Sequence, residues 1–234
     1  MKKLAIMLGA VLMTGSLMAQ KPSSDDSNYS LEGMINYDAA NGFSWNAPNL
    51  RMRYFVNDNI AARVTIGLGM DNTSGNYYED DPGTGVGTVD ESSTTWSIGL
   101  GGEYHLSGTD KLSPYFSAGV MFGGMSNSIV GTDVDEIFDP LDDALYESGS
   151  SHESSASASM FGLGLGAGMD YYVFDNVYLG VELGFSWMSM TDKGGSISST
   201  VGGTTTDVTV DSAGSMSDVS LGGGNMGFRI GWRF

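Results

Sequence analysis

Nine charged side chains stand at alternate positions in stretches that are otherwise apolar or glycine-rich. They are five arginines and four acids: Glu32, Arg51, Arg53, Arg63, Glu103, Asp170, Glu182, Arg229 and Arg233. Alternate residues of a β-strand share a face, so these side chains would all point to one side of their strands. A planar guanidinium can hold two carboxylate contacts at once, so the chemistry on offer is ion pairing. We therefore expect a network of salt bridges.

The spacing also predicts partners within this network. Counted from a short connection at 57–59, Arg53 lies directly opposite Arg63. Two like charges placed in this way are destabilising unless acids flank them. Acids do occur at about the same height on the neighbouring segments. The expected row is Glu32, Arg53, Arg63 and Glu103, and the expected second pair is Glu182 with Arg229. The alternative use of these residues is a gate that rearranges to pass ions.

Few residues are candidates for catalysis or metal binding. His105 is expected to fill the lumen or to lie at the membrane interface, and a Ser–His–acid set can be drawn around His152 and Glu153. Any serine-rich acidic stretch with one histidine allows such a set, and no nucleophile turn or phosphate loop accompanies it. One acidic group lacks the spacing of a calcium-binding loop: Asp133, Asp135, Glu136 and Asp139. We expect no catalytic residue, no cofactor and no metal site.

The elements that would position the charges are strands with one wholly apolar face. The closing stretch NMGFRIGWRF alternates glycine or arginine with Phe228, Ile230, Trp232 and Phe234. No lysine lies in any expected strand, and glycine dominates the polar face. Glycine weakens a strand unless other side chains crowd that face. The polar face is therefore expected to line a narrow interior, and the apolar face to contact lipid.

Eight alternating segments can be recognised along the chain. The expected strands are 29–37, 48–56, 60–70, 94–106, 114–124, 157–173, 177–190 and 217–234. Their connections alternate between short and long, and the long ones, rich in acids, are 38–47, 71–93, 125–156 and 191–216. Tight periplasmic turns, long extracellular loops and an even strand number are typical of outer-membrane barrels. The sequence predicts an all-β fold, an eight-stranded antiparallel up-and-down transmembrane β-barrel, with an irregularity near 222–224.

Aromatic residues gather near both ends of the expected apolar faces, as a membrane band requires. Those toward the long connections include Trp96, Phe122, Phe161 and Trp187. Those toward the short connections include Tyr54, Tyr104, Phe116, Tyr171, Trp232 and Phe234.

Composition and the start of the chain narrow the class further. The chain has 28 acidic and 10 basic residues, a net charge of −18, so nucleic acid is not an expected partner. The absence of cysteine excludes disulfide frameworks and thiolate chemistry. The opening MKKLAIMLGAVLMTGSLMAQ has the pattern of a signal peptide, whose apolar stretch is too short to cross a bilayer. The expected organisation is a signal peptide at 1–19, a polar leader at 20–28 and a barrel at 29–234.

The signal peptide, the eight segments and the final FRIGWRF together resemble the small outer-membrane β-barrel family. The likeness is to the membrane domain of outer membrane protein A and to adhesion/invasion-type barrels, in a glycine-rich style similar to Bacteroidota barrels. The resemblance implies a place in the outer membrane of a Gram-negative bacterium, in contact with outer-membrane lipid. It also implies that Phe228, Ile230, Trp232 and Phe234 form the signal read by the barrel assembly machinery.

A fold of this kind hosts several functions. The first interpretation is a structural, surface-display protein with acidic extracellular loops and a lumen filled by charge, because eight strands enclose a space that side chains can fill. The loops could contact an extracellular ligand or divalent cations. The alternatives are a small porin-like channel, a hydrophobic-solute transporter, and a membrane-embedded enzyme that uses His152.

Overall fold

The computed structural model describes residues 21–38, 42–44, 50–78, 86–135, 146–221 and 227–234. In these ranges the chain forms one antiparallel sheet of eleven strands. The strands are β1 Tyr29–Asp38, β2 Gly42–Ser44, β3 Leu50–Asn57, β4 Ile60–Tyr78, β5 Val86–His105, β6 Leu112–Val134, β7 Tyr146–Phe174, β8 Val177–Val201, β9 Thr204–Val210, β10 Ser215–Leu221 and β11 Gly227–Arg233. Over the described ranges, no helix is long and apolar enough to cross a membrane. The expected signal peptide lies outside them.

Eight of the strands close into a ring. The order of neighbours is β8, β11, β1, β3, β4, β5, β6 and β7, and β7 pairs with β8 to complete the circle. The start of β1 meets the C-terminal residue in this ring, because the Tyr29 amide donates to the Phe234 carbonyl at 3.0 Å and the return bond measures 2.8 Å. The eight-stranded antiparallel ring that the sequence predicted is confirmed.

The distribution of side chains in the ring is inverted relative to a water-soluble protein. The outward positions are large and apolar, and they remain exposed along every strand of the ring. At one level of this face, the rings of Phe122 and Phe161 lie 5.3 Å apart, and those of Phe161 and Trp187 lie 6.1 Å apart. At the opposite end, aromatic pairs join Tyr29 with Tyr54 and Trp232 with Phe234. These two aromatic levels bound an apolar band on the outward face.

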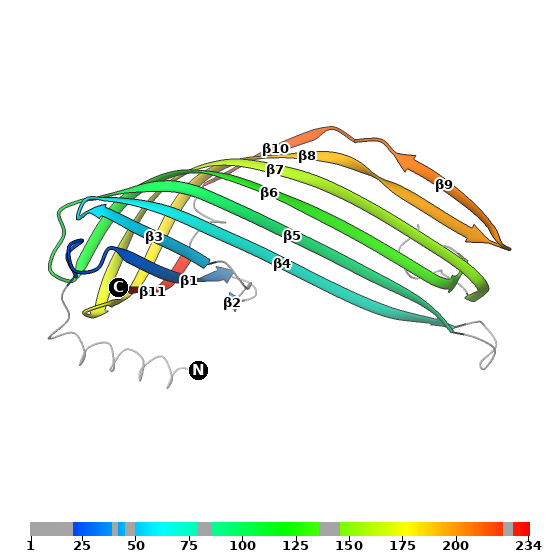
Figure 1. Ribbon diagram of the computed structural model, residues 1–234, viewed down its shortest axis with the longest axis horizontal. Coiled ribbons are helices and arrows are strands. Elements are labelled where there is room, and N and C mark those ends of the chain that lie inside the picture. Colours follow the sequence, from blue (N-terminus) through cyan, green and yellow to red (C-terminus); the bar gives the residue numbers. More distant parts are fainter. Residues whose placement is uncertain (1–20, 39–41, 45–49, 79–85, 136–145, 222–226) are drawn as a thin grey trace.

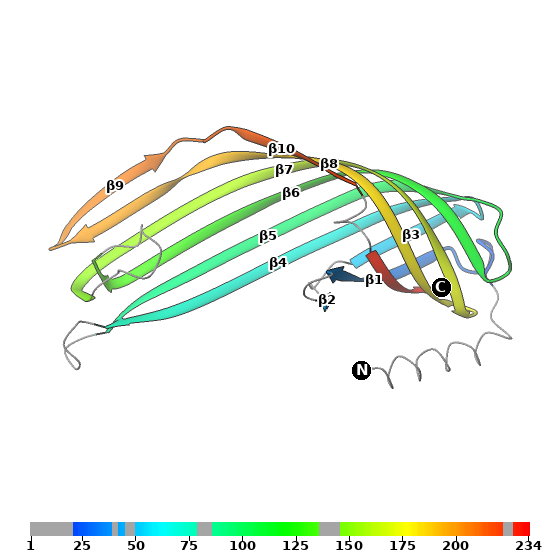
Figure 2. The same cartoon turned by 180° about the vertical axis from the view of Figure 1, so that it is seen from behind.

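Five strands, β4 to β8, continue far beyond the level of Phe122, Phe161 and Trp187, which we call the upper aromatic level. The sequence predicted long loops at 71–93, 125–156 and 191–216, and this prediction is wrong over most of their length, because paired strands occupy those residues. Figures 1 and 2 show β4 to β9 running well past the ends of β1, β3 and β11. We call this extension, with β9 and β10, the protruding sheet. Many of its outward positions carry serine or threonine in place of large apolar side chains.

The last strand of the ring is divided into β10 and β11. Leu221 pairs with Phe185 and Gly227 pairs with Glu182, so six residues on the last strand span only three residues on β8. The expected irregularity at 222–224 falls in residues outside the described ranges. The registers of β10 and β11 against β8 differ by an odd number of residues. The inward residues are therefore even-numbered in one of these two strands and odd-numbered in the other.

Candidate functional site

The interior of the ring is built from charged and phenolic side chains. The largest fully buried side chains among the described residues are three arginines, three tyrosines and one phenylalanine, followed by His105 and Glu32. Four arginines and four acids lie in mutual contact there, and we call them the ion-pair cluster: Glu32, Arg51, Arg53, Arg63, Glu103, Asp170, Glu182 and Arg229. Alternation within each strand directs these side chains inward together.

Arg53 is at the centre of the cluster. Its Nη1 atom lies 2.9 Å from Glu103 and 2.8 Å from Asp170. Its Nη2 atom lies 2.7 Å from Glu32, an ion pair without the alignment of a hydrogen bond. The Nε atom donates to the Ser30 hydroxyl at 3.1 Å. One guanidinium from β3 therefore contacts acids on β1, β5 and β7, which ties separate parts of the ring together across the interior.

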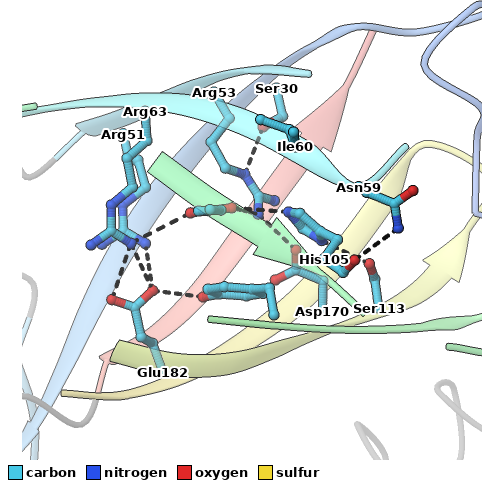
Figure 3. A network of polar contacts seen from close by, with 12 residues as sticks. Ser30, Arg51, Arg53, Asn59, Ile60, Arg63, His105, Ser113, Asp170 and Glu182 are labelled. Carbon is cyan, nitrogen blue, oxygen red and sulfur yellow. Dashed lines mark hydrogen bonds and ion pairs between the residues drawn. The ribbon is translucent and has the colours of Figure 1, made fainter. Parts of the chain in front are cut away.

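The other three arginines share the remaining carboxylate oxygens. Arg229 contacts Asp170 at 3.0 Å and Glu32 at 3.3 Å. Glu182 accepts contacts from three guanidinium groups, with distances to Arg51, Arg63 and Arg229 of 3.0, 3.1 and 3.5 Å. Figure 3 shows the guanidinium groups of Arg51 and Arg63 side by side above the Glu182 carboxylate. Arg63 also lies 3.4 Å from Glu103.

Two tyrosines and a histidine complete the hydrogen bonding of the acids. The Tyr115 hydroxyl donates to Glu182 at 2.6 Å, and the Tyr178 hydroxyl donates to Glu32 at 2.6 Å. His105 is buried with Nε2 at 3.1 Å from Glu103 and Nδ1 at 2.9 Å from the Ser113 hydroxyl. Burying a carboxylate is costly unless its lone pairs are occupied, and these groups occupy them.

Glycines opposite these large side chains make the close packing possible. A Cβ atom at Gly180 would lie 2.7 Å from Nη2 of Arg229 and 2.8 Å from Oδ1 of Asp170. A Cβ atom at Gly231 would overlap the ring of Tyr178. The glycines on the inward face therefore provide the volume that the charged and phenolic groups fill.

Arg233 lies apart from the cluster, near the short-turn end of the ring. It is fully buried, its Nε atom donates to the Ser27 carbonyl at 2.7 Å, and its guanidinium lies 3.8 Å from the centre of the Phe55 ring. Its Nη1 and Nη2 atoms have no hydrogen-bond partner. The contact with Ser27 attaches the polar leader to the last strand, and the Ser24 amide donates to Asp58 at 2.8 Å in the adjacent turn.

The charges of the cluster balance, because four guanidinium groups face four carboxylates. All of its side chains except Arg63 and Glu182 are at most 6% exposed. On the side toward the protruding sheet, a cavity of about 280 Å³ is lined by Arg51, Arg63 and Glu182 together with inward glycines. The arrangement therefore fills the lower interior and leaves the upper interior hollow.

The other sequence candidates are not brought together. His152 lies 2.9 Å from the Ser199 hydroxyl through Nδ1, but Glu153 is the next residue of the same strand and points to the opposite face. Asp133 accepts from the Gly149 amide at 2.6 Å. Glu136 and Asp139 lie outside the described residues. Over the ranges that the structure describes, no three acids, histidines or cysteines are grouped as metal ligands.

Sequence reasoning missed two parts of the site. The contacts of Asp170 with Arg53 and Arg229 join strands on different sides of the ring, so spacing along the chain carries no signal for them. The phenols of Tyr115 and Tyr178 were not considered as partners, although each stands on the inward parity of its strand, which is the signal that could have found them.

Comparison with known protein families gives one match. The profile described as outer membrane protein beta-barrel domain matches residues 7–234, nearly the whole chain. A comparison with curated proteins gives no match.

Proposed function

The chain belongs to the outer membrane protein beta-barrel family, and from that premise we propose that it is a non-conducting, non-enzymatic anchor that displays the protruding sheet at the cell surface. It is an integral protein of the bacterial outer membrane. The observation that carries the proposal is the continuation of β4 to β8 beyond the upper aromatic level as one paired sheet.

The ion-pair cluster supports the non-conducting part of the proposal. An ion that crossed the lumen would have to separate buried pairs such as Arg53 with Glu103, at 2.9 Å, and Arg53 with Asp170, at 2.8 Å. Breaking one buried pair costs on the order of 3–5 kcal/mol, and Arg53 takes part in several. The charges are better placed to hold the strands together than to pass ions.

The construction of the protruding sheet supports the display part. The register of β6 with β7 is unbroken from Pro114–Met169 to Thr132–Ser151, so the extension is a direct continuation of the barrel wall. Beyond the aromatic level, outward positions such as Ser126 and Ser157 are exposed and polar, which suits water and not lipid. A sheet built in this way holds its surface at a fixed height above the membrane.

Cysteine labelling of intact cells tests which side the sheet faces. The chain has no cysteine, so Ser126→Cys on the protruding sheet and Ser107→Cys in the β5–β6 connection each create a single thiol. We expect a membrane-impermeant maleimide to label the first variant in intact cells and the second only after the outer membrane is permeabilised. Labelling of Ser107→Cys alone in intact cells would refute the proposed orientation.

A further inference from the structure

The charges that line the cavity above the ion-pair cluster are unequal in number. Four members of the cluster line this cavity of about 280 Å³, which we call the upper hollow: Arg51, Arg63, Glu182 and Arg229. The other acids, Glu32, Glu103 and Asp170, do not line it and have fully buried side chains. Three guanidinium groups therefore face the upper hollow with one carboxylate. The lining is positive, opposite in sign to the chain as a whole, whose net charge is −18.

Arg51 and Arg63 offer hydrogen-bond donors to the upper hollow. Among the described residues, both arginines pair with acids through Nη1, and their distances to Glu182 are 3.0 and 3.1 Å. The Nη2 atoms take no part in these pairs. Arg63 is the most accessible arginine of the cluster, with 13% of its side chain exposed. Figure 3 shows the two guanidinium groups side by side, so they can hold a second carboxylate as they hold that of Glu182.

Glycine and methionine form most of the inward wall of the upper hollow. The inward glycines that line it are Gly99, Gly119, Gly162, Gly164 and Gly184. Met121 and Met188 also line it, and both pair with Gly162, which lies between them on β7. A Cβ atom at Gly162 would lie 3.5 Å from the Met121 methyl group, so this methionine lies over the neighbouring strand. The wall above the arginines is therefore mostly apolar.

The apolar wall continues upward at the next level of the barrel. Met160 pairs with Met190 there, and Gly123 pairs with Met160 from β6. Gly119 on β6 lies level with Arg63 across β5. A rise of about 3.4 Å per residue places the lower methionines about 7 Å and the upper ones about 14 Å above this level. Methionine side chains are flexible, so the wall adapts to apolar ligands of different shape.

We propose that the upper hollow binds a single-chain carboxylate amphiphile of the fatty-acid class. Its carboxylate accepts hydrogen bonds from Arg51 and Arg63, and its chain lies along the glycines and methionines above them. A small inorganic anion would gain only the contacts with the arginines, whereas an amphiphile also removes apolar surface from water. A volume of about 280 Å³ is at the small end of ligand pockets, which suits one chain and not a membrane lipid with several. This binding goes beyond the display role proposed above and does not depend on it.

Photo-crosslinking of the full-length protein in lipid vesicles tests the proposal. The probe is a medium-chain fatty acid with a diazirine at the end of its chain, and its adducts are mapped by mass spectrometry. Probe dissolved in the bilayer labels outward residues such as Phe122 and Leu163. Probe in the upper hollow labels the inward residues Met121, Met160 and Met188. We expect inward adducts that an excess of the same fatty acid without the diazirine removes.

Two comparisons test the role of the arginines. An alcohol with the same chain and diazirine should give about tenfold fewer inward adducts, because it lacks the charge that pairs with arginine. Arg63→Gln should lower inward labelling by the fatty acid by a similar factor and leave labelling by the alcohol unchanged. In this variant Glu103 keeps its contact with Arg53, and Glu182 keeps its contact with Arg51. A shift of gel mobility on boiling shows that the barrel has folded.

A pair of glycine variants tests whether the probe occupies the upper hollow itself. A Cβ atom at Gly164 meets only the Phe185 carbonyl, at 3.9 Å, so Gly164→Leu places its side chain in the hollow and leaves every charge in place. This variant should lose inward labelling. Gly102 lies on the outward face, where a Cβ atom meets only the Ala61 carbonyl, at 3.8 Å. Gly102→Leu is therefore the matched control, and its inward labelling should equal that of the wild type.

Three results would overturn the assignment. They are the absence of inward adducts on the wild type, equal inward labelling by the fatty acid and the alcohol, and unchanged inward labelling of Gly164→Leu. Equal labelling by the two probes would show an apolar site that does not recognise a carboxylate. Each of these results leaves the display role standing, because cysteine labelling of intact cells tests that role separately.

Discussion

Replacing Asp170 by asparagine tests the ion-pair cluster at a buried position. The side chain is inaccessible to solvent and its carboxylate lies 2.8 Å from Arg53 and 3.0 Å from Arg229. Asparagine keeps the shape but removes the charge, so four arginines then face three acids. A hydrogen bond to a charged group contributes about 1.5–3 kcal/mol, and Asp170 accepts two from arginine. We expect the free energy of unfolding to fall by about 3–5 kcal/mol, as when other buried pairs are broken.

A double variant distinguishes lost charge balance from general damage. Arg229→Met should by itself cost a similar amount, about 3–5 kcal/mol. Combining it with Asp170→Asn restores equal numbers of positive and negative charges. The double variant should therefore lose less stability than the sum of the single variants, by about 0.5–3 kcal/mol.

The assay is reversible urea unfolding of protein folded into lipid vesicles, followed by tryptophan fluorescence. Met169→Leu on the outward face of the same strand is the control, and a volume-conserving change of this kind should cost less than about 1.5 kcal/mol. If Asp170→Asn costs no more than this control, or if the effects in the double variant simply add, the cluster does not hold the barrel together in the way described.

Three further predictions concern the packing, the leader and assembly. Gly231→Ala should lower the free energy of unfolding by about 1–3 kcal/mol in the same assay, since its Cβ would overlap Tyr178, and an unchanged value would contradict the close packing. The hydrogen bond from the Ser24 amide holds the pKa of Asp58 below its usual value. Docking of the leader should therefore be complete above the ordinary carboxyl pKa, and it should be lost as the pH falls through the lowered pKa of Asp58. Protection of the Ser24 amide from hydrogen exchange measures this, and protection that does not change in acid would refute it. Phe234→Ala should reduce the amount in the outer membrane several-fold while refolding in detergent persists, if the closing aromatics are read during assembly; an unchanged amount would count against that role.

The barrel ring could be predicted because its strands alternate strictly between lipid-facing and interior-facing side chains. In the last strand, Arg229 and Arg233 are buried while Ile230 and Trp232 are about half exposed. Period-two alternation carries this information directly. The facing of the inward charges follows from the same signal, so the nine charged positions could be named from the sequence.

The protruding sheet could not be predicted in the same way, because its outward face is rich in serine and threonine and its inward face carries large apolar residues such as Val89 and Ile129 only at intervals. Ser128 pairs with Ser155, and Ser155 pairs with Ser196, so the outward face lacks the run of large apolar residues that marks the strands of the barrel. Their order comes from backbone pairing continued from the barrel. Contacts across the lumen were equally hidden, since the approach of Arg53 on β3 to Asp170 on β7 depends on ring diameter and strand tilt.

Single-channel recording on the purified protein in planar bilayers tests the central claim most directly. The balanced cluster of four arginines and four acids predicts a barrel without a continuous aqueous path, so the wild type should give no resolvable conductance steps. Reproducible steps of uniform size from wild-type protein of verified purity would contradict it, and would show that the cluster opens as a gate.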